Sequence, residues 1–354
     1  MNEINQLVLM SKYSGERFDL VQAGGGNSSV KIDEKMYIKA SGFLLSDLEL
    51  NKGYSCVDTN KVAKIVSNKE LLSIKNKRER EVFTSSLMKE ATIDENNRPS
   101  IETLLHSLLN KYTLHTHPLV VNVIVVKKNY EVILRKLFDG CMIVDYNTPG
   151  IELAISLNNQ LNDHIKVYGE KPKITFLQNH GLIISSDNYD EIKSLTEMVL
   201  EKIENYVNID MTKYKLVTKV SELLKRVDSD FNKITYLSED KILNELSTKE
   251  ILQEPFCPDK LVFCGVSGVE LKTIDDKSSI ENYQNKYYEL PKIIIFKGNI
   301  FCISDNVKKA KEVEEVLKFH SLVIRYSKED INYLEEDELS YLANWEAEKY
   351  RQKL

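Results

Sequence analysis

Segments with helical patterns alternate with short strand-like runs over the first half of this chain. Residues 6–15 predict a helix that ends at Gly15, because glycine often follows the last turn of a helix. In residues 100–111, apolar residues recur at helical spacing, and Ser100 can cap that helix. Residues 28–41 predict two short strands joined by a turn. This alternation favours an α/β fold.

The alternation of helical and strand-like segments continues to about residue 209. Strand-like runs lie at residues 112–117, 120–126, 141–146 and 174–186, and helical patterns at residues 148–169 and 188–209. Residues 208–250 then change to polar helical segments rich in Lys, Ser and Asp. Strand-like runs return at residues 260–267 and 292–304, and residues 335–354 predict a closing helix.

The length of 354 residues exceeds the size at which a single hydrophobic core usually stops growing. This length and the change to polar helical segments after residue 208 together predict two domains. The first would span residues 1–210, and the second, a smaller α/β region of unknown role, residues 211–354.

Composition and charge argue against several classes of protein. The formal net charge is −6 and no block of Lys and Arg on the scale of a basic arm occurs, so nucleic-acid binding is not expected. No apolar run approaches the ~18 residues of a membrane span, and the acidic N-terminus lacks the pattern of a signal peptide. The five cysteines are scattered without a C-x-x-C motif, which suits reduced thiols. We therefore expect a cytoplasmic protein without a membrane partner.

Two of the six histidines, His115 and His117, are separated by one residue. On a strand they would point to the same side, where two imidazoles suit a shared divalent cation. Burial in an apolar strand is the alternative. His180 follows another strand-like run and is a candidate third ligand, or else a histidine of a turn. Three histidines with an open fourth position are typical of a catalytic zinc site.

Glu102 is expected in the first turn of the helix over residues 100–111, where the helix dipole favours a carboxylate. Glu102 would therefore either stabilise the start of this helix or act as a base beside a metal. His106 lies one helical turn further on, so it would orient Glu102 or simply be half-buried.

Three consecutive glycines precede Asn27, Ser28 and Ser29. Such a loop is rich in free N–H groups and hydroxyls and suits an anion, although many glycine triplets are only flexible turns. A strand rather than a helix is expected after it, so neither the dinucleotide-binding fingerprint nor a P-loop fits.

Taken in order, these motifs resemble the class II aldolase/adducin superfamily. The resemblance covers roughly residues 15–205. It rests on Gly26-Asn27-Ser28-Ser29-Val30-Lys31, Ser41-Gly42, Ser100-Ile101-Glu102 with His106, His115-Thr116-His117 and Asn179-His180-Gly181. Some of these details look closer to the aldolase half of the rhamnose-utilisation aldolase–dehydrogenase proteins.

The resemblance implies a layered α/β/α domain with a mostly antiparallel central sheet. It implies an enzyme that splits a sugar or ketose phosphate by a retro-aldol reaction through a metal-stabilised enediolate. Zn²⁺ or another divalent transition metal would be held by His115, His117 and His180, with Glu102 as the general base. The positions matched to the family's phosphate loops are Gly26, Asn27, Ser41, Gly42 and Ser100. A homotetramer with sites at subunit interfaces is also implied.

The sequence departs from the sugar-phosphate aldolases at two places. Isoleucine stands at position 101 where they have a second serine, so one phosphate hydroxyl is missing. Lys39 would restore an anion contact, or else be a lysine of a strand that faces solvent. The family's tyrosine acid, which a neighbouring subunit supplies, has no matching motif, and Tyr130 and Tyr146 are nearby candidates.

Other reactions of the superfamily stay open at this point. Relatives epimerise pentulose phosphates or decarboxylate 3-oxo-acid phosphates by the same chemistry, and adducin-like proteins bind partners without catalysis.

Overall fold

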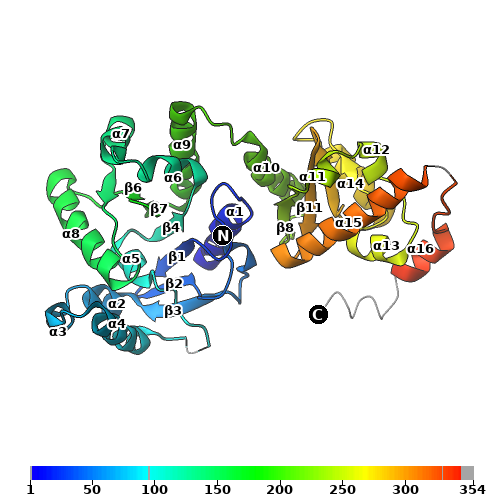
Figure 1. Ribbon diagram of the computed structural model, residues 1–354. Coiled ribbons are helices and arrows are strands. Elements are labelled where there is room, and N and C mark those ends of the chain that lie inside the picture. The colour runs from blue at the N-terminus through cyan, green and yellow to red at the C-terminus, as the bar shows by residue number, and fades with distance from the viewer. Residues whose placement is uncertain (1, 95, 329, 344–354) are drawn as a thin grey trace. The chain divides into compact units, whose positions relative to one another are not determined.

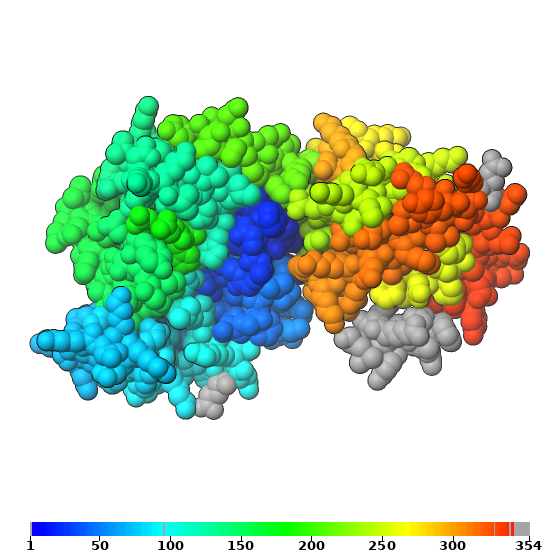
Figure 2. Space-filling model, in the orientation of Figure 1, coloured from blue at the N-terminus to red at the C-terminus, as the bar shows by residue number. Residues whose placement is uncertain are grey.

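The computed structural model describes residues 2–94, 96–328 and 330–343 (Figure 1). The chain divides into two compact units, Met1–Met211 and Thr212–Leu354. Figure 2 shows the surface of one face of the molecule, in the same orientation and colours as Figure 1.

The first unit is built on a seven-stranded sheet in the order β3-β2-β1-β4-β7-β6-β5. Neighbouring strands are antiparallel except β5 and β6, which run parallel, so the sheet is mostly antiparallel as expected. Its strands are β1 (Asn27–Ile32), β2 (Lys35–Lys39), β3 (Tyr54–Asp58), β4 (Tyr112–Thr116), β5 (Met142–Val144), β6 (Ile174–Leu177) and β7 (Gly181–Ser186).

Helices cover both faces of this sheet (Figure 1). They are α1 (Glu3–Gly15), α2 (Thr59–Ile65), α3 (Lys69–Ser73), α4 (Lys77–Ala91), α5 (Thr103–Leu108), α6 (Leu119–Val125), α7 (Tyr130–Leu137), α8 (Ile151–Tyr168) and α9 (Tyr189–Val207), with a 3-10 turn at Leu45–Asp47. Successive residues of β1 contact opposite layers: Ser28 bonds to Ser11 of α1, whereas Ser29 bonds to His106 of α5. Since side chains alternate along a strand, α1 and α5 lie on opposite faces.

A large apolar core lies on the α5 face. Alternate residues of β2, Met36 and Ile38, belong to the same buried cluster as Leu105 of α5 and Leu157 of α8. The period of two on the strand and the apolar faces of the helices account for this packing. The cluster fixes α5 against the sheet, and α5 begins directly after Glu102.

Two strand predictions were wrong. Residues 119–125 form helix α6, in which Val120, Val121, Ile124 and Val125 are buried at helical spacing. A short apolar run can form a buried strand or one turn or two of a buried helix, and the sequence pattern alone did not separate them. In the second unit, residues 258–264 form helix α13, with Pro258 at its first position, where proline is favoured.

The second unit has a four-stranded sheet in the order β8-β11-β10-β9, with β9 and β10 parallel. Its strands are β8 (Ile234–Leu237), β9 (Val269–Glu270), β10 (Ile293–Phe296) and β11 (Asn299–Ser304). Its helices are α10 (Thr212–Val227), α11 (Lys241–Asn244), α12 (Thr248–Ile251), α13 (Pro258–Cys264), α14 (Lys277–Tyr287), α15 (Val307–Ser327) and α16 (Glu336–Ala343). Apolar side chains of α15 and β11 share one core. The rest of the expected closing helix, residues 344–354, lies outside the described residues.

No helix within the described ranges is long and apolar enough to cross a bilayer.

Candidate metal centre

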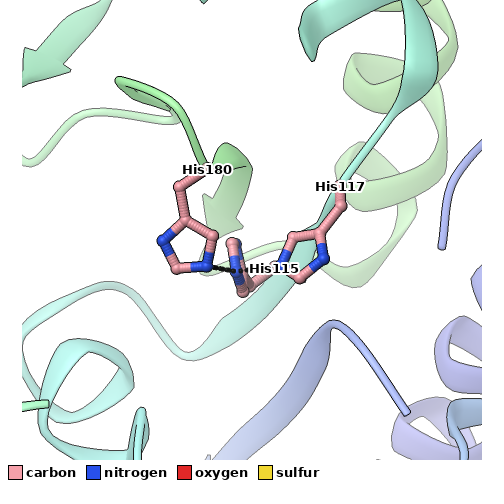
Figure 3. A group of neighbouring side chains, drawn as sticks. All are labelled: His115, His117 and His180. Atoms are coloured by element: carbon pink, nitrogen blue, oxygen red, sulfur yellow. Dashed lines mark hydrogen bonds between the residues drawn. The ribbon is translucent and has the colours of Figure 1, made fainter. Parts of the chain in front are cut away.

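Three histidines from two strand ends point toward one another (Figure 3). His115 lies in β4, His117 follows that strand, and His180 lies in the turn between β6 and β7. The Nε2 atom of His115 is 3.1 Å from Nε2 of His117 and 3.3 Å from Nε2 of His180. Strand β4 pairs with β7, which brings together histidines 65 residues apart in sequence.

Glycines allow this close approach. A Cβ atom on Gly181 would lie 2.3 Å from the carbonyl oxygen of Thr116, so only glycine lets β7 pass beside the His-x-His segment. Gly26 has a φ of +72°, and a Cβ there would lie 2.8 Å from the carbonyl oxygen of His115. Close contacts with the backbone therefore explain why both positions beside the histidine cluster are glycine.

The polar face of β1 contacts helix α5 residue by residue. Asn27 Nδ2 donates to Glu102 Oε2 at 2.6 Å, and Ser29 is hydrogen-bonded to His106 Nδ1 at 2.8 Å. Lys31 Nζ donates to the carbonyl oxygens of His106, Leu109 and Asn110, at the end of α5. Because every second residue of a strand lies on the same face, these three side chains all lie on one face of β1. This strand therefore positions both Glu102 and helix α5, which follows it.

Glu102 presents one carboxylate oxygen to the histidines. Its Oε1 lies 3.5 Å from His115 Nε2 and 3.3 Å from His180 Nε2, while Asn27 occupies Oε2. Burial acts to raise the pKa of Glu102, but the charges of His115 and His180 and the hydrogen bond from Asn27 outweigh it and lower the pKa to about 2. Glu102 is therefore ionised at neutral pH.

Glu102 stands immediately before the first residue of α5 rather than inside its first turn. The hydroxyl of Ser100 accepts the Glu102 N–H at 3.3 Å, so Ser100 supports the turn and not the helix itself. His106 is fully buried rather than half-buried. Its bond goes to Ser29, and burial lowers its pKa to about 3.

The histidine cluster suits a divalent cation. His115 Nδ1 donates to the carbonyl oxygen of Leu182 at 3.0 Å, which leaves a lone pair on Nε2. Burial lowers the pKa of His117 to about 3 and that of His180 to about 4, so both rings are neutral at neutral pH. Only one neighbour can donate to the single lone pair of His115, whereas a shared cation would satisfy all three rings. In a tetrahedral zinc site, two ligand nitrogens lie about 3.4 Å apart, close to the two separations given above.

A cavity of about 430 Å³ lies beside the cluster. Seven of the residues predicted for the site line it: Gly26, Asn27, Ser41, Gly42, Ser100, Glu102 and His117. Lys39 and Arg98 line it as well. Sequence reasoning left the role of Lys39 open and missed Arg98, whose only signal is its place two residues before Ser100.

Within the one chain, the two candidate tyrosines do not line this cavity. Tyr130 is buried and donates to Asp145 at 2.5 Å, and burial and this carboxylate raise its pKa well above the usual range. Tyr146 is exposed. Neither is among the described residues that line the cavity.

A comparison of the sequence with models of protein families found one matching family. Residues 5–207 match the model of the class II aldolase and adducin N-terminal domain. No match was found among curated proteins.

Several solved structures are similar to part of the chain. The N-terminal class II aldolase domain of a conserved protein from Thermoplasma acidophilum is 22% identical, with a TM-score of 0.49, over 58% of this chain and 94% of that one. An L-fuculose 1-phosphate aldolase is 16% identical, with a TM-score of 0.40, over 60% of this chain and 92% of that one. The L-fuculose-1-phosphate aldolase of Thermus thermophilus is 16% identical, with a TM-score of 0.38, over 58% of this chain and 95% of that one.

The family match spans more than half of the chain and includes every residue of the histidine cluster and of the cavity beside it. This chain therefore belongs to the class II aldolase and adducin family.

Proposed function

We propose that this chain is a metal-dependent aldolase that cleaves a ketose or ketose phosphate by a retro-aldol reaction. The position of Glu102 carries the proposal. Its Oε1 faces His115 and His180, at 3.5 and 3.3 Å, while its Oε2 is held by Asn27. A carboxylate oxygen fixed beside three imidazoles can exchange a proton with a substrate that is held there.

His115, His117 and His180 would hold a divalent ion, and zinc suits three imidazole ligands with an open fourth position. When bound, such an ion would polarise the substrate carbonyl and stabilise negative charge on its oxygen.

Glu102 would move the proton. In the cleavage direction, Oε1 accepts the proton of the hydroxyl on the carbon that becomes the aldehyde. The carbon–carbon bond breaks, its electron pair stays on the carbon next to the carbonyl group of the ketone fragment, and Glu102 returns the proton to that carbon of the ketone fragment. The products are an aldehyde and a shorter ketone, so no oxidant or reductant is needed. The low pKa of Glu102 keeps it ionised and ready to accept the first proton.

Asn27 would orient this base. Its Nδ2 holds Oε2, and its Oδ1 is buried without a hydrogen-bond partner among the described residues. An unpaired buried acceptor beside the cavity suits a substrate hydroxyl, since that bond would remove the cost of leaving the atom unpaired.

Product analysis tests the proposal. The full-length protein, loaded with zinc, is incubated with L-fuculose 1-phosphate and other ketose 1-phosphates, and the products are identified by mass spectrometry. Two fragments are expected. An isomerised pentulose phosphate would instead indicate an epimerase, and carbon dioxide from a 3-oxo-acid phosphate a decarboxylase. No turnover of any of these compounds by metal-loaded protein would contradict a catalytic role.

A variant of Glu102 tests its assigned role. Glu102→Gln should lower kcat by about 10²–10⁴-fold, because an amide cannot accept the proton. Its metal content should stay the same. Glu90→Gln, an exposed position on α4, is the matched control and should leave kcat unchanged. Wild-type kcat in Glu102→Gln would mean that another group is the base.

Native mass spectrometry of the same protein would test the proposed homotetramer, which rests on the family resemblance.

A further inference from the structure

The turn that carries His180 contains a residue in a left-handed backbone conformation. Strands β6 and β7 are joined by Gln178, Asn179 and His180, and the His180 N–H donates to the carbonyl oxygen of Leu177 at 3.2 Å. Asn179, the third residue of this β-turn, has a φ of +54°. A positive φ at the third position is typical of type II turns. Asparagine is one of the few residues besides glycine that adopts such a conformation at little cost.

Backbone hydrogen bonds hold this turn against its neighbours. The N–H of Gln178 donates to the carbonyl oxygen of Val144 in β5 at 2.9 Å, and the N–H of Asn179 donates to that of Val125 at the end of α6 at 3.3 Å. The side-chain oxygen of Gln178 also accepts the N–H of Tyr146 at 2.8 Å. These bonds fix the place of the turn, so the backbone angles at Asn179 set the direction in which the next side chain leaves it.

The chain has little freedom on the other side of His180. A Cβ atom on Gly181 would lie 2.3 Å from the carbonyl oxygen of Thr116 and 3.2 Å from Cδ2 of His117. Strand β7 is also paired with β4 from its second residue onward, so it cannot move aside to absorb a change in the turn. A different conformation at Asn179 would therefore move the ring of His180 itself.

The side chain of Asn179 does not explain why asparagine stands here. It is exposed, and within the described part of the chain it forms no hydrogen bond. The left-handed backbone conformation is therefore the feature that favours asparagine or glycine at this position.

We infer that Asn179 is a positioning residue of the metal centre, because its left-handed backbone conformation aims the imidazole of His180 at the other two histidines. The inference deepens the proposed function and rests on its metal centre, not on the reaction that the centre would catalyse. A β-branched residue such as valine resists a positive φ. In its place the backbone would favour an extended or right-handed conformation, which rotates the next peptide unit and turns the ring of His180 away.

Zinc affinity measured by competition with a chelator tests the inference. The full-length protein is compared with Asn179→Val, which resists the left-handed conformation, and with Asn179→Gly, which adopts it without a side chain. Asn179→Val should bind zinc at least about tenfold more weakly than the wild type, because strain at such a backbone position is substantial. Asn179→Gly should stay within about twofold of the wild type.

Cobalt gives a second measurement on the same variants. The visible spectrum of bound Co²⁺ depends on the number and arrangement of its ligands. The spectrum of Asn179→Gly should match that of the wild type, whereas that of Asn179→Val should differ because one imidazole is displaced. If the valine variant does not fold, Asn179→Ala replaces it and should bind zinc at least about threefold more weakly.

Asn208 supplies a matched control. It is another exposed asparagine with a positive φ, +56°, and it ends helix α9, outside the histidine cluster and its cavity. Asn208→Val introduces the same kind of strain, so it should lower the urea midpoint about as much as Asn179→Val does. Its zinc affinity should equal that of the wild type. The pair thus separates a loss of stability from a loss of ligand geometry.

Three results would overturn the inference. They are wild-type zinc affinity in Asn179→Val, an equal loss of affinity in Asn179→Val and Asn208→Val, and an equal loss in Asn179→Val and Asn179→Gly. The last result would assign the effect to the side chain of Asn179 rather than to its backbone.

The inference and the aldolase proposal can fail separately. If zinc affinity follows the variants as expected but no ketose phosphate is cleaved, the inference stands and the aldolase proposal is wrong. If ketose phosphates are cleaved and Asn179→Val binds zinc normally, only the inference is wrong. A wild-type protein that binds no zinc would contradict both.

Discussion

Gly25 packs directly against the ring of His117: a Cβ atom built on Gly25 would lie 2.9 Å from Nδ1 and 3.1 Å from Cε1. The glycine loop is therefore one wall of the histidine cluster as well as part of the cavity. Its neighbour Gly24 is different, because a Cβ there would meet nothing within 4 Å. A substitution at Gly25 therefore tests this contact, and the same substitution at Gly24 is its matched control.

Gly25→Ala should push the His117 imidazole away from His115 and weaken metal binding at least tenfold. Zinc affinity measured by competition with a chelator checks this. Gly24→Ala should bind zinc as tightly as the wild type does. Equal affinity in both variants would mean that the loop does not position His117.

A buried ion cluster supports the segment on which His117 lies. Arg17 is 1% exposed and bonds to both carboxylate oxygens of Asp19 and to Glu197. The backbone carbonyls of Asp19 and Leu20 accept the N–H groups of Leu119 and His117, each at 2.9 Å. The Arg17 cluster therefore anchors Asp19 and Leu20, and their carbonyl groups hold the backbone of residues 117–119, which follow β4.

Arg17→Met should lower the free energy of unfolding by about 3–5 kcal/mol, because it leaves the buried carboxylate of Asp19 without its ion-pair partner. Urea denaturation measures the change. The control is Arg135→Met, which breaks an exposed pair with Glu131 and should cost less than about 1 kcal/mol. A similar small loss in both variants would show that the Arg17 cluster is not a structural anchor.

His320 should make the stability of the second unit depend on pH. It is fully buried, donates Nε2–H to the carbonyl of Glu254 at 3.0 Å and stacks on Phe256. Burial, with a smaller effect of the Lys260 charge, lowers its pKa to about 4, against 6.5 for an ordinary histidine. Between these pH values the unfolded chain binds the proton and the folded chain does not. Stability should therefore fall, by about 3 kcal/mol in all, as the pH drops from 6.5 to 4.

Unfolding by urea from pH 7.5 to pH 4 measures this loss. His320→Gln keeps a donor for Glu254 but does not titrate, so its stability should fall less over the same range. Identical pH slopes for the two proteins would contradict the assignment to His320.

Much of the site was predictable from the sequence because its residues recur at short spacings. Asn27 directly follows the glycine triplet, and His115 and His117 are separated by one residue. What the sequence could not show is the pairing of β4 with β7, which brings His180 to them. Long-range pairing is set by the whole core rather than by local pattern.

The failures have physical causes as well. Residues 120–126 were predicted as a strand because a buried helix of Val and Ile shows no polar face. The sequence left Lys39 open between an anion contact and a solvent-facing strand lysine, because the segment of Pro99, which forms a bridge with the neighbouring Ala40, is distant in sequence. Arg98 lies in a loop without periodic pattern, so nothing local marked it as part of the cavity wall.

Metal content tests the central claim most directly. The full-length protein is purified without a histidine tag, beside His117→Ala and a control, His164→Ala, whose ring stacks on Tyr168 of α8 away from the cluster. Elemental mass spectrometry should find about one divalent metal per chain in the wild type and the control, and its loss in His117→Ala. Equal metal content in all three proteins, or none in any of them, would contradict a metal centre at His115, His117 and His180.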